Sequence, residues 1–210
     1  MRPIVFDCDG VLVDSEELSW RAWRTVAGRH GVTISDEDVA RLTGRTVAEC
    51  HAALADRGPL PALEDFGDEL GEVMHAQLEA HLQAFEDAVD ALDTLAGRVP
   101  MAVASSSYRD RLDLSLATTG LADHFDASVA GDEVARGKPA PDLFLEAASR
   151  LGVDPADCLA VEDSPPGVAS AVAAGMTVVA VERGSFGREE LLEAGATSVV
   201  PRLTAAALIR

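Results

Sequence analysis

Two aspartates stand two residues apart at the end of a short apolar segment. Asp7 and Asp9 follow Ile-Val-Phe at 4–6 and precede Gly10. Positions i and i+2 of a strand share one face of a sheet, and glycine lets the chain turn sharply beside them. An aspartate in this position can act as a nucleophile, a metal ligand or a general acid–base group.

The basic residues are unusual in type, because Lys138 is the single lysine among 17 lysines and arginines. It lies in the segment Gly-Lys-Pro-Ala-Pro-Asp at 137–142. An ammonium group is a compact point charge, whereas a guanidinium is planar and forked. This usage indicates a site that requires an ammonium group, with an accident of composition as the alternative.

Short apolar segments alternate with amphipathic ones along most of the chain. The apolar segments predict strands at 4–6, 99–104, 127–130, 158–161 and 177–181, with a weaker strand at 197–200. The amphipathic segments between them predict helices at 109–119, 142–151, 167–174 and 189–194. This alternation favours an α/β fold with a parallel sheet covered on both faces.

The stretch between the first and second strands breaks this alternation. It holds four helical patterns and no clear strand, at 16–30, 36–42, 47–55 and 63–82, and a helix at 88–95 leads back to the sheet. We therefore predict two domains. Residues 1–14 and 83–210 form the core domain, and residues 15–82 form an inserted helical cap domain.

Polar residues follow four of the predicted strands. These residues are Asp7 and Asp9, then Ser105, Ser106 and Ser107, then Asp132 with Lys138 a few residues later, and finally Glu162, Asp163 and Ser164. Ligands of open parallel sheets bind beyond the carboxyl ends of the strands. The sequence therefore predicts that these side chains converge on one site.

Four carboxylates of this set form an oxygen-rich cluster, namely Asp7, Asp9, Glu162 and Asp163. Such hard ligands suit Mg²⁺, which also prefers to share phosphate oxygens and water. The alternative is that Glu162 and Asp163 cap the following helix, which has Pro165 in its first turn. Capping accounts for one acid and leaves the other unexplained, so we favour a magnesium site.

The remaining polar residues suit a phosphate group. Ser105 and Ser106 lie where a strand gives way to a helix, and free backbone N–H groups and hydroxyls there can bind phosphate, with a simple helix cap as the alternative. Lys138 can neutralise phosphate charge and hold the nucleophilic aspartate, with an exposed surface lysine as the alternative. Together these residues indicate phosphoryl transfer in which Asp7 attacks phosphorus and Asp9 is the general acid–base group.

The net charge limits which molecules the protein can bind, and the cysteine content indicates its compartment. The formal net charge is −19 at pH 7, which repels nucleic acid and anionic membranes. The three cysteines form no Cys-x-x-Cys pair, which fits a reducing compartment. No segment resembles a signal peptide or is long enough for a membrane span. We expect a soluble cytoplasmic protein, a monomer or a weak homodimer, with a small phosphorylated substrate.

Four segments together resemble the motifs of the haloacid dehalogenase (HAD) superfamily, and within it the β-phosphoglucomutase-like branch of phosphatases and mutases. They are Phe-Asp-Cys-Asp-Gly at 6–10, Val-Ala-Ser-Ser-Ser at 103–107, Gly-Lys-Pro-Ala-Pro-Asp at 137–142 and Val-Glu-Asp-Ser at 161–164. The resemblance covers the whole chain. It implies a Rossmann-like core and a helical cap inserted after the first motif.

The resemblance also implies roles for matching residues. Asp7 resembles the nucleophile and a Mg²⁺ ligand, and Asp9 resembles the acid–base residue whose backbone carbonyl also binds Mg²⁺. Ser105 and Lys138 resemble phosphate-binding residues. Asp163 is similar to a metal ligand, with Glu162 binding directly or through water.

Departures from the family pattern reduce the number of family activities that fit this chain. Haloacid dehalogenases lack the second aspartate, and family phosphonate hydrolases use a cap lysine, which this chain does not have. The mutases carry a His and an Arg where this chain has Ser19 and Val47, so net hydrolysis is favoured over isomerisation. Arg45, in a cap turn, could bind a second anionic group of the substrate or be an ordinary surface arginine. Arg109 is a weaker candidate for binding such a group.

The predicted function is that of a Mg²⁺-dependent phosphatase acting on a small metabolite, with sugar and sugar-acid phosphates favoured. Three alternatives stay open: a phosphoglucomutase-like isomerase, a phosphoglycolate-type phosphatase, and a non-catalytic protein that binds a phosphorylated ligand.

Overall fold

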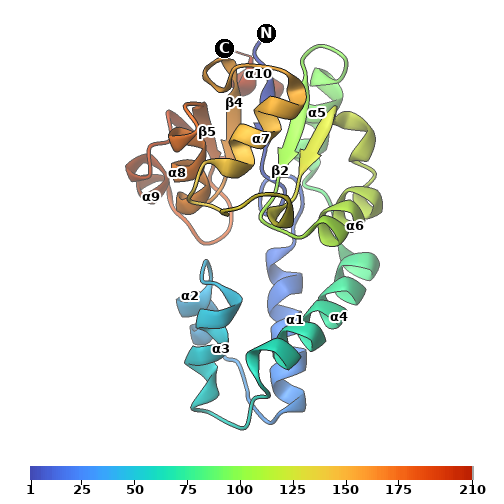
Figure 1. Ribbon diagram of the computed structural model, residues 1–210, viewed down its shortest axis with the longest axis vertical. Coiled ribbons are helices and arrows are strands. Elements are labelled where there is room, and N and C mark those ends of the chain that lie inside the picture. Colours follow the sequence, from blue (N-terminus) through green and yellow to red (C-terminus); the bar gives the residue numbers. More distant parts are fainter. Residues whose placement is uncertain (210) are drawn as a thin grey trace. The chain divides into compact units, whose positions relative to one another are not determined.

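The computed structural model describes residues 1–209. The chain forms two compact units, which we describe separately. Met1–Asp14 and Gln83–Arg210 make up the first unit, and Ser15–Leu82 make up the second. Figure 1 shows the course of the chain through both units.

The first unit is built on a parallel sheet of six strands in the order β3-β2-β1-β4-β5-β6. The strands are β1 (Ile4–Phe6), β2 (Met101–Ala104), β3 (Ala127–Val129), β4 (Leu159–Glu162), β5 (Thr177–Val181) and β6 (Ser198–Val200). All three residues of β1 are fully buried, as expected of a central strand covered on both faces. The predicted α/β fold with a parallel sheet is confirmed.

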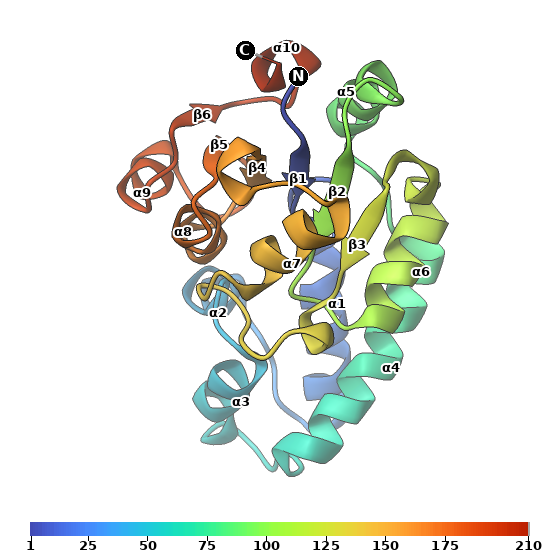
Figure 2. The same cartoon turned by 45° about the horizontal axis from the view of Figure 1, so that its top comes forward.

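Helices cover both faces of this sheet (Figure 2). They are α5 (Glu86–Leu95), α6 (Arg109–Thr119), α7 (Asp142–Leu151), α8 (Pro165–Ala173), α9 (Arg188–Glu193) and α10 (Ala205–Leu208), with short 3₁₀ helices at Ala122–His124, Gly131–Glu133 and Pro155–Asp157. Side chains of α7, α8 and α9 share one buried apolar cluster with the strands. Helix α5 contacts α10 on the other face.

The structure contains most of the helices and strands predicted for the first unit, with their ends shifted by a few residues. One shift concerns a residue of the predicted site. The sequence places Glu162 just after the strand, whereas in the structure it is the last residue of β4. Helix α10 was not predicted, since four residues are too few to show a helical period.

The second unit consists of α1 (Glu16–Arg29), α2 (Asp36–Leu42), α3 (Val47–Ala55) and α4 (Leu63–His81). Trp23 of α1 lies against Phe66 of α4, with ring centroids 5.0 Å apart. Helices α2 and α3 both begin with capping boxes, at Ser35 and Thr46. These local signals explain why α2 and α3 begin where the sequence predicts them. The role of this unit as a cap domain stays a prediction.

Asp38 joins the two ends of the α2–α3 pair. This buried carboxylate accepts hydrogen bonds from the Ser35 backbone at 3.0 Å and from both terminal nitrogens of Arg57 at 2.5 and 2.6 Å. The Arg57 guanidinium beside Asp38 holds the pKa of that carboxyl well below its usual range. Among residues 1–209, no helix has the length and apolar character needed to cross a bilayer.

Candidate active site

Asp7 directly follows the central strand β1 and is held at its end by the sheet. Its backbone N–H donates to the carbonyl of Val161 at 2.9 Å, which extends the pairing of β1 with β4 by one residue. The side chain is 9% exposed. The parallel ladder therefore places this carboxylate beside the residues that end β4.

Lys138 connects the carboxylates of two strands. Its Nζ lies 2.5 Å from Asp7 Oδ1 and 2.5 Å from Glu162 Oε1, and its side chain is 8% exposed. This burial rules out the alternative of an ordinary surface lysine. The segment that follows Lys138 is anchored from α8, where the Ser170 hydroxyl donates to the carbonyl of Ala140 at 2.6 Å.

Glu162 and Asp163 complete a cluster of acids. Oxygens of Asp7, Glu162 and Asp163 lie within 4.8 Å of one another. Glu162 is fully buried, and its Oε2 accepts hydrogen bonds from the backbone N–H groups of Asp163 and Ser164 at 2.9 and 3.0 Å. Ser164, and not either acid, caps helix α8 by accepting from the Gly167 N–H at 3.3 Å. Helix capping therefore does not explain the two acids.

Two glycines leave room for these carboxylates. Gly10 has a φ of +80°, and a Cβ added there would lie 2.0 Å from Asp163 Oδ2. A Cβ added at Gly167 would lie 1.7 Å from Glu162 Oε1. No side chain can occupy either place without displacing the acid, which explains why the Asp-Gly turn after β1 matters to the site.

The electrostatics of this cluster favour an added positive charge. Burial, together with Glu162 and Asp9, raises the pKa of Asp7 to about 7, although Lys138 opposes the shift. Burial and the charges of Glu162 and Asp7 raise the pKa of Asp163 well above its usual value. Burial would lower the pKa of Lys138, but Asp7 and Glu162 raise it above its usual value. Three carboxylates and one ammonium carry a formal charge of −2 here, which a divalent cation would balance.

The serine segment after β2 is held against the loop after β3. Ser105 is fully buried, and its Oγ accepts the backbone N–H of Ser107 at 3.1 Å. The Gly131 N–H donates to the carbonyl of Ser107 at 2.8 Å, and a Cβ at Gly131 would lie 2.4 Å from the carbonyl oxygen of Ser106. Ser106 is exposed. The turn thus has a fixed backbone, a buried hydroxyl and an accessible one.

Asp9 has partners that the sequence analysis did not identify. Ser107 Oγ donates to Asp9 Oδ2 at 3.0 Å, and a terminal guanidinium nitrogen of Arg111 donates to Asp9 Oδ1 at 3.0 Å. Ser107 was noted only as a hydroxyl after β2. Arg111 lies in the first turn of α6, whereas Ser107 lies before the N-cap residue Tyr108, so no helical spacing in the sequence related the two residues.

The two arginines considered as anion-binding residues have different positions. Arg109 is engaged in a network on the surface of the first unit, where its guanidinium contacts Asp113 at 3.0 Å, Ser128 Oγ at 2.9 Å and Glu133 at 2.5 Å. These contacts give Arg109 a structural role. Arg45 is exposed in the turn between α2 and α3 of the second unit, and its role stays a prediction.

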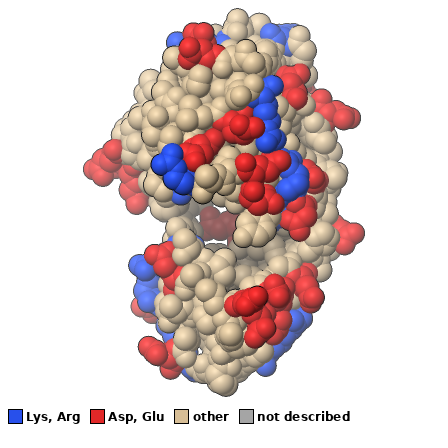
Figure 3. All heavy atoms as spheres, viewed as in Figure 1, with Lys and Arg blue, Asp and Glu red and all other residues tan. Residues whose placement is uncertain are grey.

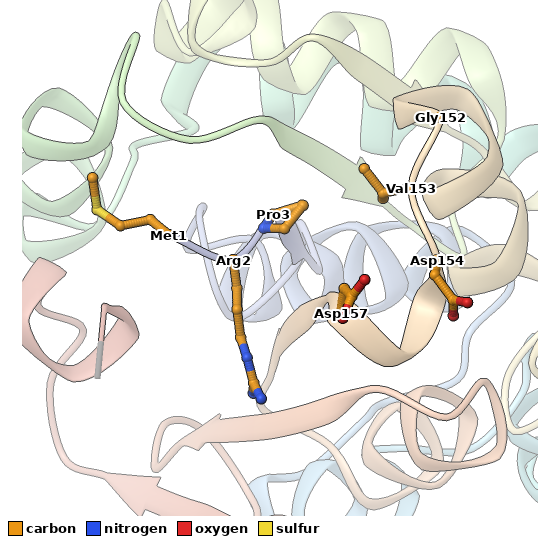
Figure 4. A pocket seen from close by; sticks show the side chains of 7 residues that line it. All are labelled: Met1, Arg2, Pro3, Gly152, Val153, Asp154 and Asp157. Carbon is orange, nitrogen blue, oxygen red and sulfur yellow. The ribbon is translucent and has the colours of Figure 1, made fainter.

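A cavity of about 620 Å³ opens at the opposite edge of the sheet (Figure 4). Its lining residues precede β1 and β4, so they lie at the amino ends of these strands: Met1, Arg2, Pro3, Gly152, Val153, Asp154 and Asp157. None of them belongs to the acid cluster, and the chemistry predicted above is therefore not located there.

Acidic residues outnumber basic residues in this chain. Acidic side chains are spread over the face seen in Figure 3, with basic side chains among them in small groups. Asp and Glu number 36 against 17 Lys and Arg. This excess of acid would repel a polyanion.

The family model described as haloacid dehalogenase-like hydrolase matches residues 4–181, and the chain belongs to this family. The resemblance predicted from the four motifs is thereby confirmed. The family and its phosphatase relatives also confirm the predicted enzyme class, a phosphoric monoester hydrolase.

Individual relatives agree with this assignment. Fructose-1-phosphate phosphatase YqaB of Escherichia coli (strain K12) is 35% identical over 183 residues, which cover 85% of this chain and 95% of that protein. The bifunctional riboflavin kinase/FMN phosphatase of Arabidopsis thaliana is 33% identical over 85% of this chain, but this match spans only 48% of that protein. The crystal structure of a candidate β-phosphoglucomutase from Thermotoga maritima has a TM-score of 0.83 and 31% identity, covering 95% of this chain and 94% of that chain.

Proposed function

We propose that the protein hydrolyses a small phosphorylated metabolite through a phosphorylated aspartate at Asp7. The observation that supports this most is the buried Asp7 carboxylate, with Lys138 Nζ at 2.5 Å and two further acids close by. A carboxylate with a nearby cation can approach a phosphate dianion that it would otherwise repel. Catalysis of phosphoryl transfer consists mainly of such positioning and charge neutralisation.

The reaction proceeds in two steps. An oxygen of Asp7 attacks phosphorus, the bond between phosphorus and the substrate oxygen breaks, and Asp9 gives its proton to the departing alkoxide. Asp9 then takes a proton from a water molecule, which attacks phosphorus and releases inorganic phosphate and the Asp7 carboxylate. In both steps Ser105, Ser106 and Lys138 bind the phosphate oxygens.

The acid cluster fits a divalent cation, for which we propose Mg²⁺. The side chains of Asp7, Asp163 and Glu162, the last directly or through water, would hold it together with the backbone carbonyl of Asp9. The formal charge of −2 and the raised pKa values of Asp7 and Asp163 support this assignment. Bound Mg²⁺ would neutralise charge on the phosphate and keep Asp7 ionised.

We propose a sugar phosphate or sugar-acid phosphate as the substrate. The similarity to a fructose-1-phosphate phosphatase over 95% of that protein supports this class. Arg45 would bind a second anionic group of a sugar acid. The similarity to a candidate β-phosphoglucomutase keeps isomerisation as the second possibility, although Ser19 and Val47 replace the mutase residues.

Phosphate release from a panel of phosphorylated sugars, sugar acids, polyols, phosphoglycolate and nucleotides tests this proposal. We expect release concentrated on one sugar class and abolished by EDTA. Conversion of β-glucose 1-phosphate to glucose 6-phosphate without free phosphate would instead establish a mutase.

The variant Asp7→Asn tests the nucleophile. We expect activity to fall by more than roughly 10³-fold, because an amide oxygen is a poor nucleophile. Asp157→Asn is the matched control, since Asp157 lies at the opposite edge of the sheet. Substantial turnover by the Asp7 variant would contradict the mechanism.

A further inference from the structure

Arg111 and Ser107 approach the carboxylate of Asp9 from α6 and from the turn before this helix. Ser107 precedes the N-cap residue Tyr108, and Arg111 lies in the first turn of the helix. Their donors contact different oxygens of the carboxylate, Oδ2 and Oδ1, each at 3.0 Å. Hydrogen bonds to both oxygens define the plane of the carboxylate as well as its position.

The position of Arg111 is not what stability alone would favour. An arginine in the first turn of a helix opposes the helix dipole and normally extends into solvent. Here its Nε is buried and has no hydrogen-bond partner among the described residues. A buried donor without a partner destabilises the folded protein. The side chain is thus held inward, toward Asp9, at a cost in stability.

Arg111 also gives Asp9 a cation of its own. Lys138 is engaged by Asp7 and Glu162, and its Nζ is 2.5 Å from an oxygen of each. The contact between Arg111 and Asp9, with side chains 32% and 31% exposed, directs the carboxylate toward α6.

We propose that Arg111, together with Ser107, is a positioning residue that holds Asp9 in the orientation for proton transfer to the leaving oxygen. This inference rests on the proposed phosphatase function. Arg111 does not itself exchange a proton. It restricts rotation of Asp9, so that the proton is delivered when the bond between phosphorus and the substrate oxygen breaks.

The leaving group provides the test. An alkoxide leaving from a sugar phosphate needs a proton, whereas 4-nitrophenolate leaves without one. We measure the first turnover as release of the alcohol or of 4-nitrophenol, because the later attack of water is common to both substrates. For Arg111→Met we expect release of the sugar to slow by about 10²-fold, and release of 4-nitrophenol by less than about threefold.

Further variants separate positioning from folding. Arg111→Lys retains a donor for Asp9 and should recover part of the rate on the sugar phosphate. Ser107→Ala should show the same dependence on the leaving group in weaker form. Arg98→Met, which removes an exposed arginine from the loop after α5, should react like the wild type with both substrates. The unfolding temperature of each variant identifies any that fails to fold.

Several results would overturn the inference. An equal loss on both substrates would show that Arg111 supports the fold of the site as a whole, and no loss on either would show that Asp9 needs no positioning. If the wild type releases phosphate and Asp7→Asn does not, the proposed phosphatase function stands. Either of the two results above then refutes only the positioning role of Arg111. If the wild type hydrolyses no phosphate ester, the proposed function fails and this inference fails with it.

Discussion

The two aspartates that follow β1 have different ionic partners, although they are only two residues apart. Asp7 contacts Lys138, and Asp9 contacts Arg111. Their roles in the proposed reaction also differ, since one must remain an unprotonated nucleophile and the other must gain and lose a proton. Separate cations allow each carboxylate to be held in its own environment.

Binding of Mg²⁺ should stabilise the protein through Asp163. With Mg²⁺ at roughly a hundredfold excess over its dissociation constant, the unfolding temperature should rise by about 5–10 °C. Asp163→Asn should lose most of this rise, because one acid of the cluster is removed. Asp157→Asn should retain it. A full rise in the Asp163 variant would place the cation elsewhere.

The stability of the metal-free protein should fall as the pH rises through the range in which Asp7 ionises. The carboxyl has a pKa of about 7 in the folded protein and 3.8 ordinarily. Between these values the native state binds more protons than the unfolded state, so raising the pH favours unfolding. The loss reaches up to about 4 kcal/mol above pH 7.

Denaturation by urea in EDTA between pH 5 and 8 measures this effect. The free energy of unfolding of Asp7→Asn, relative to the wild type, should increase across this range, because the variant has no carboxyl to ionise at this position. Parallel pH profiles for the two proteins would show that Asp7 is not a titrating group in this range.

At the scale of elements, one arginine joins three segments of the first unit. Arg183, which follows β5, donates to the carbonyl of Val11 at 2.6 Å, forms an ion pair with Asp87 of α5 and lies 4.0 Å from the ring centroid of Phe85. The side chains of Arg183 and Asp87 are only 11% and 12% exposed. This arrangement braces the turn that contains Asp9 and Gly10 against the sheet.

Arg183→Met should therefore destabilise the protein by about 3 kcal/mol, since it removes the nearer of two cations from a buried carboxylate. Urea denaturation measures the change. Arg202→Met is a matched control, because Arg202 lies 3.9 Å from the same carboxylate but is 70% exposed, and exposed pairs contribute about 0–1 kcal/mol. Equal effects of the two substitutions would contradict this account.

At the scale of the whole molecule, excess negative charge opposes the folded state. A formal net charge of −19 on 210 residues produces repulsion that salt screens. The unfolding temperature in EDTA should therefore rise as NaCl increases from about 10 to about 200 mM, and KCl should have the same effect. A falling unfolding temperature would show that the ion pairs contribute more than the repulsion.

Much of the architecture could be predicted from local sequence patterns. The fully apolar segment at 4–6 predicted a buried strand, and the order of strands and helices predicted a parallel sheet. The ends of the strands then indicated where polar side chains gather. The ends of elements were less certain, as Glu162 shows, because a buried glutamate inside a strand has the same sequence context as one just beyond it.

The sequence by itself predicted that Asp7, Lys138, Glu162 and Asp163 lie close together, because the carboxyl ends of parallel strands meet at one edge of a sheet. Only the tertiary structure showed that Arg111 is a cationic partner of Asp9. Asp9 and Arg111 are 102 positions apart, and Val11 and Arg183 are 172 apart. Periodicity assigns a residue to a face of its own helix or strand, whereas its partner depends on how separate elements pack against each other.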